Sequence, residues 1–70
     1  MSFDEQVIRA MEPGHRYEVT RLAVALRSDY SRTFFALSRL YSWGFVDAYD
    51  VNEYELTELG EKLQKLLLAK

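Results

Sequence analysis

The chain has 70 residues, with a net charge of −2 and 49% hydrophobic residues. This length allows one domain, residues 1–70, and the absence of cysteine excludes disulfides and thiolate metal sites. No run approaches the roughly 20 apolar residues of a membrane span, and the first residues are polar and acidic, so we expect a cytoplasmic protein without a secretory signal. Dedicated nucleic-acid-binding proteins are usually basic, so the slight negative charge argues against DNA binding.

A first helix is predicted from Ser2, because Ser2 and Glu5 have the spacing of a capping box. Pro13 and Gly14 then end the helical pattern. Between these points the expected apolar stripe consists of Phe3, Val7, Ile8 and Met11.

A second helix is predicted from about Glu18 or Val19 to Leu26, after a connector with one or two extended residues at Tyr17. Its expected buried face consists of Val19, Leu22, Ala23 and Leu26. The next helix follows after only a short turn, and two short helices joined in this way are typical of a helix-turn-helix.

The third helix is predicted from about Tyr30 to Trp43, with Asp29 as its cap and Gly44 as a left-handed residue that closes it. The three-four spacing predicts an inward face of Tyr30, Thr33 or Phe34, Leu37, Leu40 and Tyr41. The outward face consists of Ser31, Arg32, Phe35, Ser38, Arg39 and Ser42. We expect a slight rotation of the helix to bury Phe35; an exposed Phe35 would instead contact a thymine methyl group or a protein partner.

Beyond Gly44 the pattern alternates and predicts a β-hairpin with its turn near Asn52. Thr57 is predicted to cap a last helix with a buried stripe of Leu59, Leu63, Leu66 and Leu67. Leu68 lies off that stripe, so the first helix or a second subunit is expected to cover it, and a homodimer through the terminal helices is our expectation. The predicted core consists of Phe3, Val7, Ile8, Leu22, Leu26, Leu37, Leu40, Phe45, Leu56, Leu59 and Leu63.

Three segments in this order, residues 19–23, 37–46 and 54–60, resemble the winged helix-turn-helix domain, most closely the MarR and PadR groups of repressors. The resemblance implies an α+β fold, mainly α, with a three-helix core, a two-stranded β-hairpin wing and a C-terminal helix. It also implies a DNA-binding transcriptional regulator, in which the helix around residues 30–43 reads the major groove of double-stranded DNA.

On this reading, the candidate DNA contacts lie on the outward face of the third helix and on the segment before it. Arg32 and Arg39 are expected to make the main contacts, because guanidinium groups bind guanine edges and phosphates. The full set of expected contacts is Ser31, Arg32, Phe35, Ser38, Arg39, Ser42, Arg21 and Arg27.

The hairpin departs from the pattern of the DNA-binding families, whose wings carry Arg or Lys. Here the predicted hairpin carries only acidic charges, at Asp47, Asp50, Glu53 and Glu55. Carboxylates repel phosphates, so we do not expect this hairpin to contact DNA. The alternative function is therefore a winged-helix module that binds protein and not DNA.

No catalytic constellation is expected, since no nucleophile, base and orienting acid come together in the pattern. His15 is the single histidine, which argues against a metal site, and the hairpin acids have no glycine-rich loop of a calcium site. We therefore expect no enzyme activity, no cofactor and no small-molecule substrate.

Overall fold

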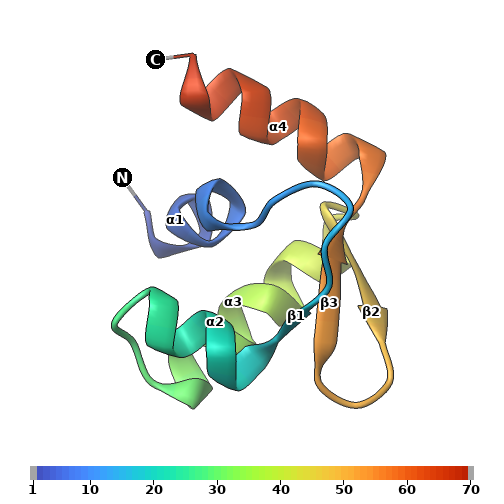
Figure 1. Ribbon diagram of the computed structural model, residues 1–70. Coiled ribbons are helices and arrows are strands. Elements are labelled where there is room, and N and C mark those ends of the chain that lie inside the picture. Colours follow the sequence, from blue (N-terminus) through green and yellow to red (C-terminus); the bar gives the residue numbers. More distant parts are fainter. Residues whose placement is uncertain (1, 70) are drawn as a thin grey trace.

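The chain folds into four helices and a small sheet, and the computed structural model in Figure 1 describes residues 2–69. The elements in chain order are α1 Phe3–Ala10, β1 Tyr17–Glu18, α2 Val19–Ala25, α3 Tyr30–Ser42, β2 Val46–Tyr49, β3 Glu53–Leu56 and α4 Glu58–Leu68. In Figure 1, α1 and α4 form the upper part, α2 and α3 the lower part, and the sheet lies along one side. The predicted α+β class with mainly helical content is confirmed.

Three helices begin at the capping residues that the sequence predicts, and each cap forms a short-range hydrogen bond. Ser2 Oγ accepts from the Glu5 amide at 3.2 Å, while the Glu5 carboxylate accepts from the Ser2 amide, which completes the capping box of α1. Asp29 accepts from the third amide of α3 at 2.7 Å, and Thr57 accepts from the third amide of α4 at 3.0 Å.

Two helices end in a left-handed residue. Gly44, with φ of 85°, follows α3 as predicted, and Arg27, with φ of 53°, follows α2. In each case the next amide donates to the carbonyl five residues earlier at 2.9 Å, which closes the helix. Arginine is unfavourable at this φ, because its Cβ crowds the backbone, whereas glycine has no such cost.

The sheet has three antiparallel strands in the order β1-β3-β2, with Tyr17 opposite Tyr54 and Val46 opposite Leu56. The predicted two-stranded hairpin is present as β2 and β3, and β1 adds a third strand that was not predicted. The extended residue at Tyr17 was expected, but a strand of two residues has no periodicity that would reveal its pairing.

The core is formed by both pairs of helices and by the inner side of the sheet. Its buried hydrophobic residues are Val7, Ile8, Met11, Val19, Leu22, Ala23, Ala36, Leu37, Leu40, Val46, Tyr54, Leu56 and Leu67. Of the predicted core, Phe3, Leu26, Phe45 and Leu63 are only partly buried and pack against it.

The inward face of α3 differs from the prediction at its flanks. Tyr30 and Tyr41 are exposed, and Ala36, which was not predicted to face inward, is buried beside Leu37. Of the two predicted alternatives, Thr33 is the buried one. Thr33 satisfies its hydroxyl by donating to the carbonyl oxygen of Asp29 at 2.9 Å, so its burial leaves no unpaired polar group. Two sides of α3 carry apolar residues that could face the core, and the side with the smaller residues is the one that is buried.

The inward face of α4 also differs from the prediction. Its buried residues are Gly60, Gln64 and Leu67, whereas Leu59 and Leu66 are exposed. Gly60 lets the first turn approach the backbone of Phe45 closely, and the Gln64 amide donates to backbone carbonyls at the end of α1. Of the leucine stripe predicted to be buried, Leu59 and Leu66 therefore face outward, Leu63 is half-buried, and Leu67 is buried.

The side chain of Thr57 connects α4 to the end of α3, and its loss should weaken the fold. The Thr57 hydroxyl donates to the carbonyl oxygen of Gly44 at 2.6 Å while it caps α4. We expect Thr57→Ala to lower the free energy of unfolding by about 1–2 kcal/mol, and Thr57→Ser to retain most of it. Urea unfolding followed by circular dichroism measures both, and equal stability of the two variants would contradict the role of the hydroxyl.

Candidate nucleic-acid interface

The candidate interface is the outward face of α3 together with α2 and the turn between them. Each predicted contact residue lies on or beside this face, and Ser31, Arg32, Phe35, Ser42, Arg21 and Arg27 are exposed. Arg39 is also exposed at half of its side chain, and Ser38 is half-buried. The structure therefore brings the predicted set together on one side, but the side chains differ in what they already contact.

Arg39 is engaged within the chain. Its Nε and Nη2 atoms donate to the two carboxylate oxygens of Asp4 at 2.9 and 2.7 Å. These hydrogen bonds raise the pKa of the Arg39 guanidinium above its ordinary value. Because Asp4 compensates its charge and occupies one edge of the fork, Arg39 is a weaker phosphate ligand than a free arginine. A partner 35 positions away in the sequence could not be predicted from spacing along α3.

Arg32 points toward the same side of α3. Its guanidinium carbon lies 4.0 Å from the centre of the Phe3 ring, within the range of a cation–π contact. This contact leaves the charge of Arg32 uncompensated, since no carboxylate of residues 2–69 forms an ion pair with it. Arg32 therefore remains a candidate cation, held at the edge of α3 facing α1.

Arg21 and Arg27 carry the remaining candidate charges of this face. Both side chains are exposed, and neither forms an ion pair within the described part of the chain. Arg27 lies in the turn between α2 and α3, and Arg21 lies in the first turn of α2. Arg27, together with Arg32 in the first turn of α3, therefore places cations near the turn between the two helices.

The three serines differ in how freely they face solvent. Ser31 is exposed in the first turn of α3, whereas the exposed Ser42 hydroxyl donates to the carbonyl oxygen of Arg39 at 2.7 Å. Ser38 lies beside the phenol of Tyr54. Burial raises the pKa of Tyr54, and the Ser38 hydroxyl acts in the opposite direction. Ser38 is thus partly turned toward the sheet.

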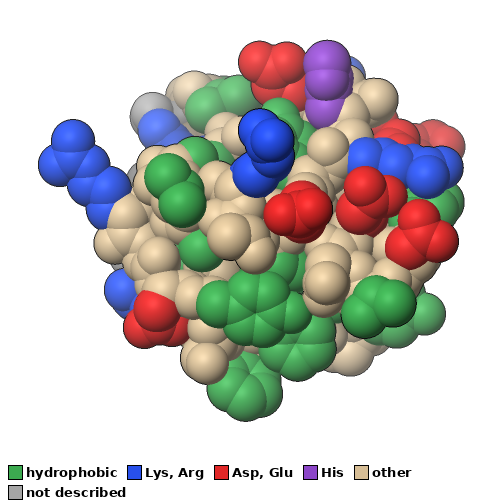
Figure 2. Space-filling view, turned by 60° about the horizontal axis from the view of Figure 1, so that its bottom comes forward, with side chains coloured by type: hydrophobic (Ala, Val, Ile, Leu, Met, Phe, Trp, Pro, Cys, Tyr) green, Lys and Arg blue, Asp and Glu red, His purple; other side chains and the backbone are tan. Residues whose placement is uncertain are grey.

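Aromatic side chains cover much of the same face. Tyr30 and Phe34 stack with ring centres 5.9 Å apart, and Phe35 lies against Phe34 at the same distance. Phe35 is 59% exposed, so the expected burial of this residue is wrong. Tyr41 is exposed on the same flank as Tyr30. Figure 2 shows hydrophobic side chains gathered in the lower part of this view.

Sequence reasoning missed this aromatic group because it assigned Tyr30 and Tyr41 to the core. A recurrence of aromatic residues at positions 30, 34 and 41 was the available signal, since these positions share one flank of a helix. We call Tyr30, Phe34, Phe35 and Tyr41 the aromatic patch. Its contiguous apolar surface requires explanation in a way that single exposed residues do not.

The hairpin, whose loop lies beside the start of α3, is acidic, but one arginine lies on it. The Arg16 guanidinium is 3.8 Å from the centre of the Tyr49 ring, and its Nε atom lies 3.6 Å from a carboxylate oxygen of Glu55. Tyr30 reaches the hairpin loop as well, where its hydroxyl donates to Asn52 Oδ1 at 2.9 Å. The start of α3 therefore adjoins both the turn that carries Arg27 and the loop of the acidic hairpin.

Comparison with known proteins adds no family assignment. No family model, no curated protein and no solved structure matches the chain. Within residues 2–69, no helix is long and apolar enough to cross a membrane. The same part of the chain contains no group of three His, Asp or Glu side chains placed to hold a metal ion.

Proposed function

We propose that the chain is a winged helix-turn-helix domain that binds double-stranded DNA and acts as a transcriptional regulator. In this proposal α2 and α3 are the helix-turn-helix, and β2 and β3 are the wing. The observation that carries the proposal is the exposed outward face of α3, which has the uncompensated Arg32 at its edge and hydroxyl groups along it. The major groove of B-DNA admits one α-helix in this way.

The proposed contacts differ from the full predicted set. Arg21, Arg27 and Arg32 supply the cations for phosphates, and Ser31 donates from the first turn of α3. Arg39 contributes little in this proposal, because Asp4 already binds it. Phe35 is free to contact a thymine methyl group, since its ring is exposed.

A salt titration of binding to random duplex DNA tests this assignment. We expect affinity to fall as salt rises, and Arg32→Ala to reduce the magnitude of the log–log slope by about 0.9, the value of one lost phosphate contact. Arg39→Ala is the matched control on the same side of α3, and its slope should remain that of the unchanged protein. Fluorescence anisotropy of a labelled duplex measures both slopes.

A second variant separates the effect of a lost charge on DNA affinity from any effect on the stability of the fold. Arg27→Gly removes a cation at a φ of 53°, where glycine is favoured, so the free energy of unfolding should not fall. DNA affinity should nevertheless fall, with a slope reduced by about 0.9 if Arg27 contacts one phosphate. Absence of any binding to random duplex at low salt would rule out the DNA proposal altogether.

The second candidate function is binding of a protein partner, and the aromatic patch is the observation that favours it. Exposed aromatic groups supply much of the binding energy at protein interfaces, and the acidic hairpin beside the patch repels DNA. Absence of binding to duplex DNA at low salt would favour this candidate.

A further inference from the structure

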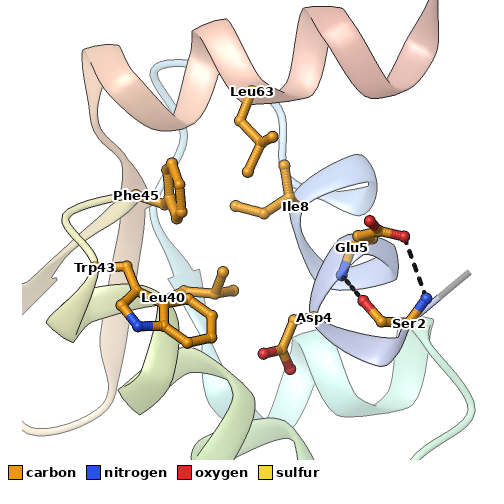
Figure 3. Close-up of a pocket in the computed structure, with 8 residues that line it drawn as sticks. All are labelled: Ser2, Asp4, Glu5, Ile8, Leu40, Trp43, Phe45 and Leu63. Atoms are coloured by element: carbon orange, nitrogen blue, oxygen red, sulfur yellow. Dashed lines mark hydrogen bonds between the residues drawn. The ribbon is translucent and has the colours of Figure 1, made fainter.

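The outward face of α3 has two edges that differ in their chemistry. The edge facing α1 carries Arg32 and the Arg39–Asp4 pair. Figure 3 shows Asp4 on the side of α1 that is turned toward α3. The edge facing the hairpin carries Tyr30, whose hydroxyl donates to Asn52 in the hairpin loop. One edge of this helix is therefore cationic, and the other is aromatic.

The charges beside the aromatic edge are negative. Asp50 is exposed in the hairpin loop, and Glu53 begins β3. Arg16, which lies over the hairpin, has its Nε atom 3.6 Å from a Glu55 oxygen and is thereby compensated. A helix in the major groove has a phosphate backbone on each side, so duplex DNA would bring one backbone toward these acids. A single strand has one backbone, and the edge with Arg32 accepts it without the other.

The rest of the face presents aromatic rings. Tyr30, Phe35 and Tyr41 are 44, 59 and 55% exposed, and the rings of Tyr30 and Phe34 stack with their planes only 7° apart. In a duplex each base is covered on both faces by its neighbours, so a protein ring reaches little more than a thymine methyl group. Unpaired bases expose their faces, and every base stacks favourably on an aromatic side chain. The aromatic patch therefore fits unpaired bases better than the edges of base pairs.

We propose that the outward face of α3 binds single-stranded DNA in preference to duplex DNA. The backbone of the strand runs along the edge with Arg32, and the bases lie across the aromatic patch, with Phe35 in its middle. Tyr30 and Tyr41 are 11 positions apart, which is about 16 Å along the helix axis, so the patch spans a short run of nucleotides. Ser31 is exposed between the two edges and can donate to a phosphate or a base.

This inference deepens the proposed function, because it rests on α3 as the DNA-binding element and names the form of DNA that it binds. The cationic charge of the segment is small, since Asp29 caps α3 between Arg27 and Arg32. A strand that continues past the start of α3 reaches Arg27 as its second cation. We therefore expect few phosphate contacts and a weak salt dependence, with a log–log slope of about 0.7 in magnitude for each contact.

Fluorescence anisotropy of the full chain with one labelled strand tests the proposal. The strand has about 12 nucleotides, cannot pair with itself, and is used alone and annealed to its complement. At low salt we expect the chain to bind the single strand at least about threefold more tightly than the duplex. Equal or tighter binding to the duplex would overturn the inference and leave the proposed function standing. Binding to neither form would overturn both.

Matched variants place the strand on the aromatic patch. Phe35→Leu keeps an apolar side chain but removes the ring, so the affinity for the single strand should fall about fivefold or more, whereas Phe35→Trp should retain it. Arg32→Ala should reduce the magnitude of the single-strand salt slope by about 0.7. Leu66→Ala, at an exposed position of α4, should change neither quantity. Circular dichroism checks that each variant is folded. Unchanged single-strand affinity in Phe35→Leu would show that the rings do not stack on bases, and the inference would fall.

Discussion

Replacing Gly60 with alanine is expected to destabilise the chain more than any other single methyl addition at a glycine. A Cβ at Gly60 would lie 2.0 Å from the carbonyl oxygen of Phe45 and 3.0 Å from its carbonyl carbon. Both are backbone atoms, and the oxygen already accepts from the Thr57 amide at 3.1 Å, so it cannot move without breaking that bond. We expect a loss of about 3 kcal/mol or more, a large share of the roughly 4–10 kcal/mol of a domain this size.

The other two glycines provide the controls. Gly14 has φ of 81°, and a Cβ added there would meet no atom within 4 Å; Gly44 has φ of 85° with only Leu59 Cδ2 nearby. Alanine at either site meets only the cost of a left-handed backbone, about 1–2 kcal/mol. Urea unfolding of the three variants ranks them. If Gly60→Ala loses no more than Gly14→Ala, then α4 does not approach Phe45 as closely as described.

Helix starts could be predicted from the sequence because their causes are local. Ser2, Asp29 and Thr57 each bind an amide three residues later, so residue type and spacing are sufficient. The glycine that closes α3 could be predicted for the same reason, since the left-handed closing residue bonds only within the last turns of its own helix. The same reasoning missed Arg27, because arginine is not a residue that the left-handed region favours.

The choice of buried face could not be predicted for α4, because the helix has two candidate faces. One carries Leu59, Leu63 and Leu66, and the other carries Gly60, Gln64 and Leu67. Hydrophobicity favours the leucines, yet the structure buries the second face, where glycine permits close approach and glutamine satisfies the end of α1. Both reasons depend on segments far away in the sequence, so periodicity alone could not supply them.

For the candidate interface, the residues on the outward face of α3 could be predicted from the sequence, but their contacts with other segments could not. That α3 would carry serines and arginines outward was predictable from helical spacing. That Asp4 would bind Arg39 was not, because the two residues meet only when α1 packs against α3. Packing therefore changes the chemistry of a face whose composition was predicted well: the cations that remain available lie nearer to the turn between α2 and α3.

Replacing Gln64 with leucine should also cause a large loss of stability. Gln64 is buried, and its Nε2 atom donates to the carbonyl oxygen of Ile8 at 2.8 Å and to that of Met11. Leucine has a similar volume but no donor, so the carbonyl groups at the end of α1 lose these buried partners. We expect the free energy of unfolding to fall by about 1–3 kcal/mol, the cost of leaving the Met11 carbonyl group without a partner. The Ile8 carbonyl oxygen still accepts from the Met11 amide at 3.3 Å. Gln6→Leu, the same change at an exposed position of α1, should stay within about 0.5 kcal/mol.

A Gln64→Glu variant distinguishes the lost donor from altered packing through its dependence on pH. An ionised carboxylate at this buried position would face carbonyl oxygens, so the pKa of the introduced carboxyl group in the folded state should lie above the value of about 4.3 in the unfolded chain. A group with a raised folded pKa stabilises the fold fully below the unfolded pKa, and this stability is lost as pH rises through the folded pKa. Relative to the unchanged protein, the variant should therefore be least impaired near about pH 4 and most impaired at neutral pH. A deficit that is independent of pH would show that packing, and not hydrogen bonding to α1, is the role of Gln64.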